Sequence, residues 1–440
     1  MMKRLFYIIL DLVVVYGSIL LSYLLLSQLE KLEDLHRNFV AFLSVMPFIG
    51  IFYIILMYIF GLYNITRKSI NELLYSVFLI TVLLTVGIMG IGFFIRGDAM
   101  AFPRSVILLS AVFYFVFLSF WRVLTVLITR RVYGMKKITV IGDKDSKLCE
   151  AIVNKYPHQY KIENKCDDFD ISTDFGTMIK SVDEVFMSAD IPQEIRREIL
   201  SLAIRYKKEV FFIPEYFDLS IMGAIFNKSD DIPTYQISYI ELSPEDEVLK
   251  RLIDIVLAGI ALVISLPFAI ITALLIKLDG GPIIYSQERL TKNSKLFKIL
   301  KFRTMVPDAE KLSGPVFAGE DDPRITKLGK FLRSIRMDEV PQLINVLKGD
   351  MSIVGPRPER PFFVEQFERE IPEYHYRLAV KAGLTGLAQV EGKYNTSAEN
   401  KLRYDLIYIN NYSLWQDFLI ILRTLKILFM TSSTEGVSSK

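Results

Sequence analysis

Long apolar stretches separated by short polar segments dominate the first third of the chain. Four of them are long enough to cross about 30 Å of hydrocarbon as helices, and they cover residues 5–26, 39–60, 73–95 and 106–128. The first is too long for a cleaved signal peptide, and three more follow it. The pattern therefore predicts a membrane protein with a four-helix transmembrane bundle over residues 1–132.

Basic residues flank these helices at alternate ends and indicate their orientation. Loops rich in Lys and Arg stay on the cytoplasmic side, and the basic flanks are Lys3, Arg4, Arg67, Lys68, Arg130, Arg131, Lys136 and Lys137. Both ends of the bundle are therefore expected in the cytoplasm. Asp11 lies inside the first helix, where an ionisable group is costly and is often functional. We favour the structural alternative, in which Asp11 hydrogen-bonds a neighbouring helix or reaches the membrane interface.

A different pattern follows the bundle, over residues 133–243. Buried β-branched runs at 136–142, 182–187 and 210–213 predict strands, and helical periodicity at 192–207 predicts a helix between two of them. This order is typical of a small parallel sheet with crossover helices, a degenerate Rossmann-like α/β module. The turn after Gly142 lacks the spaced glycines of a dinucleotide site. We therefore favour a role in assembly or regulation over nucleotide binding.

One more apolar run, at residues 252–276, decides the topology of everything after it. Asp254 lies near its start and Pro267 in its middle, where proline removes a backbone hydrogen bond and kinks a helix. The residues that follow, 278–430, are rich in Lys and Arg, and basic segments tend to stay cytoplasmic. We therefore expect a re-entrant membrane helix over about 249–277. A fifth spanning helix with a translocated domain is the alternative.

Composition supports a membrane protein and narrows the chemistry. Hydrophobic residues make up 52% of the chain, against about 45–50% in an average soluble domain. The net charge of +3 gives no global basic surface for nucleic acid. Two cysteines and three histidines, scattered along the chain, are too few and too far apart for a disulfide framework or a zinc site.

The C-terminal part, residues 244–440, carries five motifs in series. They are GGPIIYSQER at 280–289, FKILKFRTM at 297–305, DDPRITKLGKFLRS at 321–334, DEVPQLINVLKGDMSIVGPRPE at 338–359 and GLTGLAQV at 383–390. On these motifs the chain resembles the polyprenyl-phosphate hexose-1-phosphate transferases, the long-form monotopic phosphoglycosyl transferases that prime bacterial surface polysaccharides. The resemblance extends over the whole chain, more weakly before residue 245. It implies that residues 244–440 form a mostly helical catalytic domain.

The pair Asp338 and Glu339 is the candidate catalytic centre. Both precede Pro341, which is tolerated only in the first turn of a helix, so they are expected at a helix N-terminus. Taken alone they could be an acidic cap. The resemblance implies instead that Asp338 attacks the β-phosphate of a UDP-sugar and forms a phosphosugar-enzyme intermediate, with Glu339 as its partner in charge or proton handling. It also implies Mg²⁺ as cofactor, with Asp338 as a metal ligand.

Cations near this pair would neutralise a pyrophosphate. Arg357 lies between two prolines that stiffen its backbone, and we favour phosphate binding over a rigid surface turn. Further candidates for phosphate or nucleotide binding are Lys301, Arg303, Arg324, Arg333 and Lys381. Lys381-Ala382 replaces the Arg-Pro that relatives often carry, which leaves the loop shape open. Gln287 and Arg289 belong to the family pattern without a role that chemistry assigns.

The function implied by the resemblance is transfer of a sugar 1-phosphate from a UDP-sugar to polyprenyl (undecaprenyl) phosphate, with release of UMP. This would be the first membrane step of exopolysaccharide, capsule, O-antigen or glycoprotein glycan synthesis, at the cytoplasmic face of a bacterial inner membrane. Residues 414–430 are apolar but interrupted at helical spacing, which is typical of an interface helix. Expected partners are membrane lipid and further copies of the chain in a homo-oligomer, such as a dimer, with no nucleic acid. The alternatives are a non-enzymatic scaffold or regulator of polysaccharide assembly, and an NAD-dependent nucleotide-sugar enzyme.

Overall fold

A computed structural model describes residues 2–428 except 30–34, 63–69, 95–102, 145–146, 157–158, 168–173, 190, 238–240, 279, 307–321 and 393–395. Its chain forms two compact units, Met1–Ile213 and Pro214–Lys440. The bundle and the α/β module, taken as separate domains from the sequence, both lie in the first unit. The second unit begins at Pro214, before the predicted boundary at residue 243, because helix α8 (Tyr216–Met222) packs its buried Leu219 against the C-terminal part.

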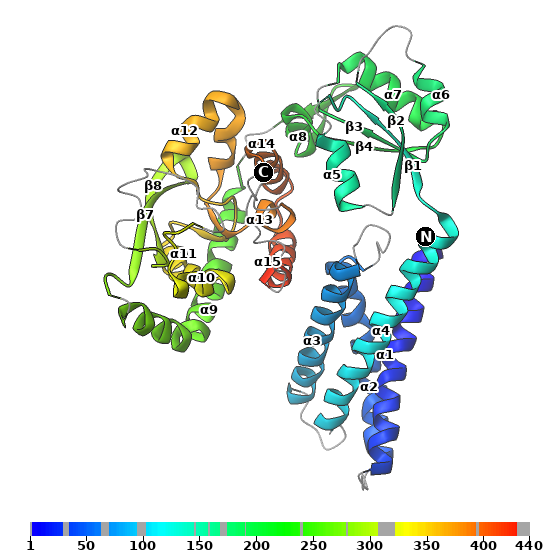
Figure 1. The fold of residues 1–440 in the computed structure, drawn as a ribbon, viewed down its shortest axis with the longest axis vertical. Helices are drawn as coiled ribbons and strands as arrows, with labels where there is room; N and C mark the ends of the chain where they lie inside the picture. The colour runs from blue at the N-terminus through cyan, green and yellow to red at the C-terminus, as the bar shows by residue number, and fades with distance from the viewer. Residues whose placement is uncertain are drawn as a thin grey trace. The chain divides into compact units, whose positions relative to one another are not determined.

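Four apolar helices form the N-terminal bundle (Figure 1): α1 (Met2–Leu29), α2 (Leu35–Ile59), α3 (Ile70–Phe94) and α4 (Arg104–Tyr133). Candidate spans by length and hydropathy are Leu5–Gln28, Ile70–Gly90 and Arg104–Thr129 in the bundle, and Pro244–Leu278 beyond it. In α2 the described apolar segment is the shorter Val45–Ile59. The helices coincide with the expected stretches, and the described part of the third ends at Phe94.

A buried ion pair lies inside this bundle. Asp11 of α1 pairs with Arg122 of α4, and both side chains are fully buried. Tyr53 of α2 donates its hydroxyl to the same carboxylate at 2.7 Å, and Arg122 donates to the Leu62 carbonyl at 2.9 Å. Asp11 therefore binds neighbouring helices, as the structural alternative required. The sequence analysis did not identify Arg122, because its partner Asp11 lies 111 positions away in the chain and no local pattern links the two.

The sheet that follows is parallel and four-stranded, in the order β2-β1-β3-β4. Its strands are β1 (Lys136–Ile141), β2 (Tyr160–Cys166), β3 (Glu184–Met187) and β4 (Glu209–Phe212), and its helices are α5 (Lys147–Lys155), α6 (Phe175–Lys180) and α7 (Gln193–Arg205). Helix α5 covers one face, and α6 and α7 cover the other (Figure 1). Both faces of the sheet are therefore covered, which explains the buried apolar runs of the central strands β1 and β3.

Helix α9 (Pro244–Leu278) opens the C-terminal part of the chain as one 35-residue helix with Pro267 inside it. Figure 1 shows it bending part-way along its length. The remaining elements are β7 (Ile284–Thr291), η2 (Lys292–Ser294), β8 (Lys295–Phe302), α10 (Lys327–Ser334), η3 (Met337–Glu339), α11 (Gln342–Lys348), β9 (Ser352–Val354), α12 (Pro361–Glu370), η4 (Pro372–Ala379), β10 (Gly383–Thr385), α13 (Leu387–Glu391), α14 (Ala398–Asn410) and α15 (Leu414–Leu428). A hairpin of β5 (Ile225–Ser229) and β6 (Ile232–Gln236) precedes α9.

Both ends of α9 are bonded to the domain that follows it. Near its start, Lys250 pairs with Asp417 of α15, and Arg251 donates to the Leu347 carbonyl at 2.7 Å. Asp254 accepts a bond from the Ile353 amide at 2.9 Å. Near its end, the Ile276 carbonyl accepts from Arg303 at 3.3 Å. Helix α9 is thus held near both of its ends by one domain.

Two of the charges that interrupt α15, Asp417 and Arg423, have partners. Asp417 is buried against Lys250, and Arg423 bonds Glu391 of α13 at 2.7 Å. The described helix ends at Leu428, so the last two residues of the predicted segment lie outside the described residues. These polar interruptions therefore dock the helix on the domain.

Candidate active site

The acidic pair lies on a helical turn that leads into α11. Arg336 has a left-handed backbone (φ 56°) that sets off the short helix η3, and Val340 and Pro341 keep right-handed helical angles up to α11. Asp338 and Glu339 are therefore at a helix N-terminus, as expected. Proline fits there because the first turn has no backbone acceptor for its missing N–H.

Glu339 is held by two cations from different elements. Lys301 of β8 donates to its Oε1 atom at 3.1 Å, and Arg357 donates to the same oxygen at 3.3 Å. Burial by itself would raise the pKa of this carboxyl, but Lys301, Arg357 and Arg336 outweigh it and hold the pKa well below its usual range. Glu339 is therefore a fixed negative charge.

Asp338, its neighbour, has a different environment. Its side chain is 7% exposed, and among the described residues it makes no hydrogen bond or ion pair. Burial raises its pKa, the adjacent Glu339 raises it further, and Lys301, Arg333 and Arg336 oppose both effects. A capping role would require a bond to a backbone amide, which this carboxylate lacks within the described chain. Its oxygens remain available to a substrate.

Beside Arg357, the backbone at Gly355 packs closely against the backbone of a second segment that contains Gly383 and Gly386. A Cβ atom on Gly355 would meet the Lys381 carbonyl oxygen at 2.4 Å, and one on Gly383 would meet the Gly355 amide nitrogen at 2.1 Å. One on Gly386 would meet the Gly355 carbonyl oxygen at 2.2 Å. This approach explains why two motifs, far apart in sequence, both require glycine.

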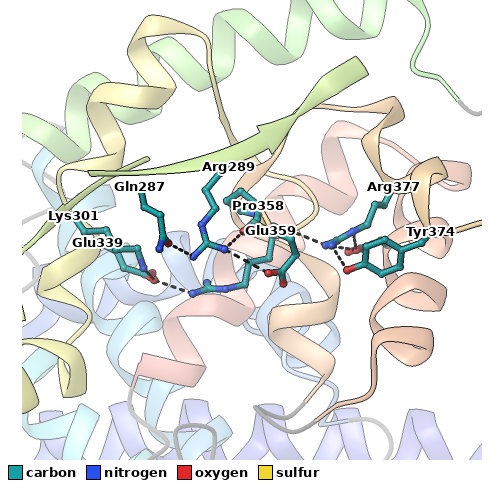
Figure 2. Close-up of polar contacts among 10 residues, drawn as sticks. Gln287, Arg289, Lys301, Glu339, Pro358, Glu359, Tyr374 and Arg377 are labelled. Atoms are coloured by element: carbon teal, nitrogen blue, oxygen red, sulfur yellow. Dashed lines mark hydrogen bonds and ion pairs between the residues drawn. The ribbon is translucent and has the colours of Figure 1, made fainter. Parts of the chain in front are cut away.

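Two arginines hold the turn that carries Arg357 from opposite sides (Figure 2). Arg289 of β7 donates to the Pro358 carbonyl at 3.2 Å and pairs with Glu359 at 3.5 Å. Arg377 of η4 donates to the Arg357 carbonyl at 2.9 Å. We call Arg289 and Arg377 the turn clamp. Because both bonds go to backbone carbonyls, the clamp fixes the turn and leaves the Arg357 guanidinium directed at Glu339.

Polar side chains orient each arginine of the clamp. Arg289 donates to Gln287 at 2.7 Å, and burial lowers its pKa to about 10 although Glu359 opposes the shift. Arg377 donates to Asp405 of α14 at 2.9 Å and to the Tyr374 hydroxyl at 2.7 Å. The roles of Gln287 and Arg289, unassigned from sequence, are thus positional.

The other predicted cations divide into two groups. Arg333 donates to Thr304 Oγ1 at 2.9 Å and lowers the pKa of Asp338, so it belongs to the site with Lys301 and Arg357. Of the three others, Arg303 is buried and donates to the Ile276 carbonyl of α9 at 3.3 Å, and Arg324 pairs with Asp322 at 2.8 Å. Burial and the like charge of Arg251 lower the pKa of Lys381, whereas Asp254 raises it. The role of these three in phosphate or nucleotide binding stays a prediction.

Several site residues were missed from sequence. Arg336 contributes charge to both carboxylates, and its position two residues before the pair was a usable signal. Arg377, Tyr374 and Asp405 lie outside the motifs, and the ion pair joins positions 28 apart. Only the packing of η4 on α14 brings them together.

The donor set fits a magnesium ion shared with a substrate. Among the described residues no three His, Cys, Asp or Glu side chains gather into an all-protein metal site. Mg²⁺, however, is bound through one or two carboxylates together with substrate phosphates and water. Asp338, buried and without a partner in the described chain, and Glu339 beside it provide that number of ligands.

The first turn of the α/β module is poorly suited to bind a dinucleotide. Asp143, just after β1, accepts bonds from the Leu148 and Cys149 amides at 2.9 and 2.8 Å. Those amides begin α5, where a bound pyrophosphate would be placed in a dinucleotide site. A carboxylate already occupies them, which opposes the NAD-dependent alternative.

Comparison with known proteins matches residues 245–431 to the family model described as bacterial sugar transferase. A galactosyl transferase of Streptococcus agalactiae is 34% identical over 329 residues, covering 67% of this chain and 72% of the relative. A UDP-N-acetylgalactosamine-undecaprenyl-phosphate N-acetylgalactosaminephosphotransferase of Aeromonas hydrophila is 44% identical over 203 residues, covering 45% and 48%. A UDP-glucose:undecaprenyl-phosphate glucose-1-phosphate transferase of Escherichia coli is 38% identical over 222 residues, covering 49% and 47%. The match thus spans about half the length of the last two relatives.

Proposed function

Since the chain belongs to the bacterial sugar transferase family, we propose that it moves a sugar 1-phosphate from a UDP-sugar to undecaprenyl phosphate and releases UMP. The contrast between the two adjacent carboxylates carries the proposal. Glu339 is fixed by two cations. Asp338 is buried, has a pKa raised by burial and by Glu339, and has no hydrogen-bond or ion-pair partner in the described chain. A nucleophile needs the second environment.

In the first step an Asp338 oxygen attacks the phosphorus bonded to the sugar. An Asp–O–P bond forms, the bond from that phosphorus to the bridging oxygen breaks, and its electron pair leaves with UMP. Lys301, Arg333 and Arg357 stand around the acidic pair and would balance the negative charge of the pyrophosphate. Mg²⁺ held by Asp338, with Glu339 beside it, would neutralise further phosphate charge.

In the second step a phosphate oxygen of undecaprenyl phosphate attacks the same phosphorus. A new P–O–P linkage forms and the Asp338 carboxylate is expelled unchanged. One carboxylate serves as nucleophile and leaving group in turn, so no net charge accumulates on the enzyme.

We place the active site on the cytoplasmic face of a bacterial inner membrane, with α9 re-entrant. The support is that residues near both ends of α9, Arg251 and Ile276, bond one globular domain. A straight spanning helix would hold its ends about 30 Å apart on opposite faces of the hydrocarbon. The bend in α9 and its Pro267 agree with re-entry.

The decisive experiment is an assay of full-length protein in membranes with labelled UDP-sugars, undecaprenyl phosphate and Mg²⁺. We expect one sugar to yield labelled lipid and UMP, and Asp338→Asn to abolish both. Asp230→Asn is the matched control, because Asp230 is exposed and its φ of 60° also suits asparagine. Release of UDP would contradict phosphosugar transfer, full activity of Asp338→Asn would contradict Asp338 as the nucleophile, and no turnover by the wild-type protein with any sugar would favour the scaffold alternative.

A further inference from the structure

Three polar side chains lie on one face of the helical run formed by η3 and α11. Asp338 and Gln342 are four positions apart, and Gln342 and Asn345 are three apart. Residues at these spacings are neighbours on a helix surface, and the backbone stays helical from Met337 through Pro341 into α11. Gln342 therefore lies between the candidate nucleophile and Asn345.

Asn345 shows what a structural amide on this face looks like. Its Oδ1 atom accepts from the Leu300 amide at 3.0 Å, and its Nδ2 atom donates to the Lys298 carbonyl at 2.8 Å. The side chain is 1% exposed. Its bonds hold α11 against β8, the strand that carries Lys301.

Gln342 is as buried as Asn345 but has no such partners. It is 3% exposed, and its Nε2 atom has no hydrogen-bond partner among the described residues. A buried donor without an acceptor is destabilising, so native proteins rarely keep one without a functional reason. One turn away, the Asp338 carboxylate also lacks a partner in the described region.

We propose that Gln342 is a substrate-binding catalytic residue, whose Nε2 donates to a non-bridging oxygen of the phosphoryl group that is transferred at Asp338. The inference rests on the proposed function. The same phosphorus is attacked in both steps, so one donor beside Asp338 serves both. A neutral amide suits this place because it can donate a hydrogen bond to a phosphoryl oxygen without forming an ion pair with Asp338. A cation at the same place would form that ion pair with the nucleophile.

The test is Gln342→Met, which keeps the length and burial of the side chain and removes the donor. We expect the first step, measured as UMP release and as label on the protein, to slow roughly 10²-fold, the range found for loss of one preorganised donor. Thermal stability should stay equal or rise, because an unsatisfied buried group is removed. Asn345→Leu is the matched control and should lower thermal stability, since it strands two backbone groups of β8.

The outcomes separate the two proposals. Unchanged rates in Gln342→Met, or a fall in its thermal stability like that of Asn345→Leu, would overturn the inference about Gln342 while wild-type UMP release upheld the proposed function. Release of UDP by the wild-type protein would overturn both.

Discussion

Asp338 and Glu339 are adjacent in the chain yet have opposite electrostatic environments. Lys301 and Arg357 bond the Glu339 carboxylate, whereas Asp338 has only through-space attraction from Lys301, Arg333 and Arg336. The pKa of Glu339 is lowered and that of Asp338 is raised. Environments that push two carboxyl pKa values apart are how a site assigns them different roles.

Lys301→Gln tests this electrostatic account. Lys301 lowers the pKa of both carboxyls, so its removal should raise them. The reaction requires ionised Asp338, so activity is present above its pKa and lost as pH falls through it. The acid limb of the pH profile for UMP release should therefore move to higher pH. Lys298→Gln, exposed on the same strand, should leave the limb in place; equal shifts in both variants would contradict a local effect.

At the scale of elements, the site is a meeting of short segments. Strand β8 contributes Lys301, η3 contributes the acidic pair, and the turn after β9 contributes Arg357. The turn clamp ties that last turn to β7 and η4, and Asp405 ties η4 to α14. Each segment is too short to hold its own position, so contacts between them set the geometry.

Arg377→Met removes one arginine of the clamp and leaves Asp405 buried without its cation. We expect a loss of about 3–5 kcal/mol of stability, as for a broken buried pair. The double variant Arg377→Met/Asp405→Leu should recover most of the stability but little of the activity, because the Arg357 carbonyl still lacks its donor. Thermal unfolding and UMP release measure the two. Recovery of both would show that the pair serves stability alone.

At the scale of the whole molecule, the path of α9 decides on which side of the membrane the site lies. Hydrogen bonds and an ion pair join the first part of α9 to α11, α15 and β9. Helix α9 is therefore part of the C-terminal domain at whatever depth it lies in the lipid.

The topology of α9 can be tested with single cysteines in a variant whose Cys149 and Cys166 are replaced by serine. One cysteine replaces Glu245, in the first turn of α9, and the other replaces Lys295, beyond its end, and both positions are exposed. A membrane-impermeant thiol reagent should label both from the cytoplasmic side and neither from outside. Labelling of the Lys295 position from outside would establish a fifth spanning helix.

The sequence alone determined the four apolar helices of the first third of the chain, three of the four strands of the parallel sheet and the helical placement of Asp338 and Glu339, whereas strand β2 was missed. Each of these follows from local pattern, because apolar length, periodicity and proline position act within one segment. The sequence also pointed to Lys301, Arg333 and Arg357 as candidates for phosphate or nucleotide binding.

Only the tertiary structure showed that Lys301 and Arg357 bond Glu339, whereas Arg303 donates to the Ile276 carbonyl and Arg324 pairs with Asp322. It also paired Asp11 with Arg122, joined Arg377 to Asp405, and left Gln342 buried without a partner in the described chain. These facts depend on side chains far apart in sequence sharing one buried space. Charge and hydrogen-bond satisfaction are decided there, because burial sets their strength and the sequence does not record which groups meet.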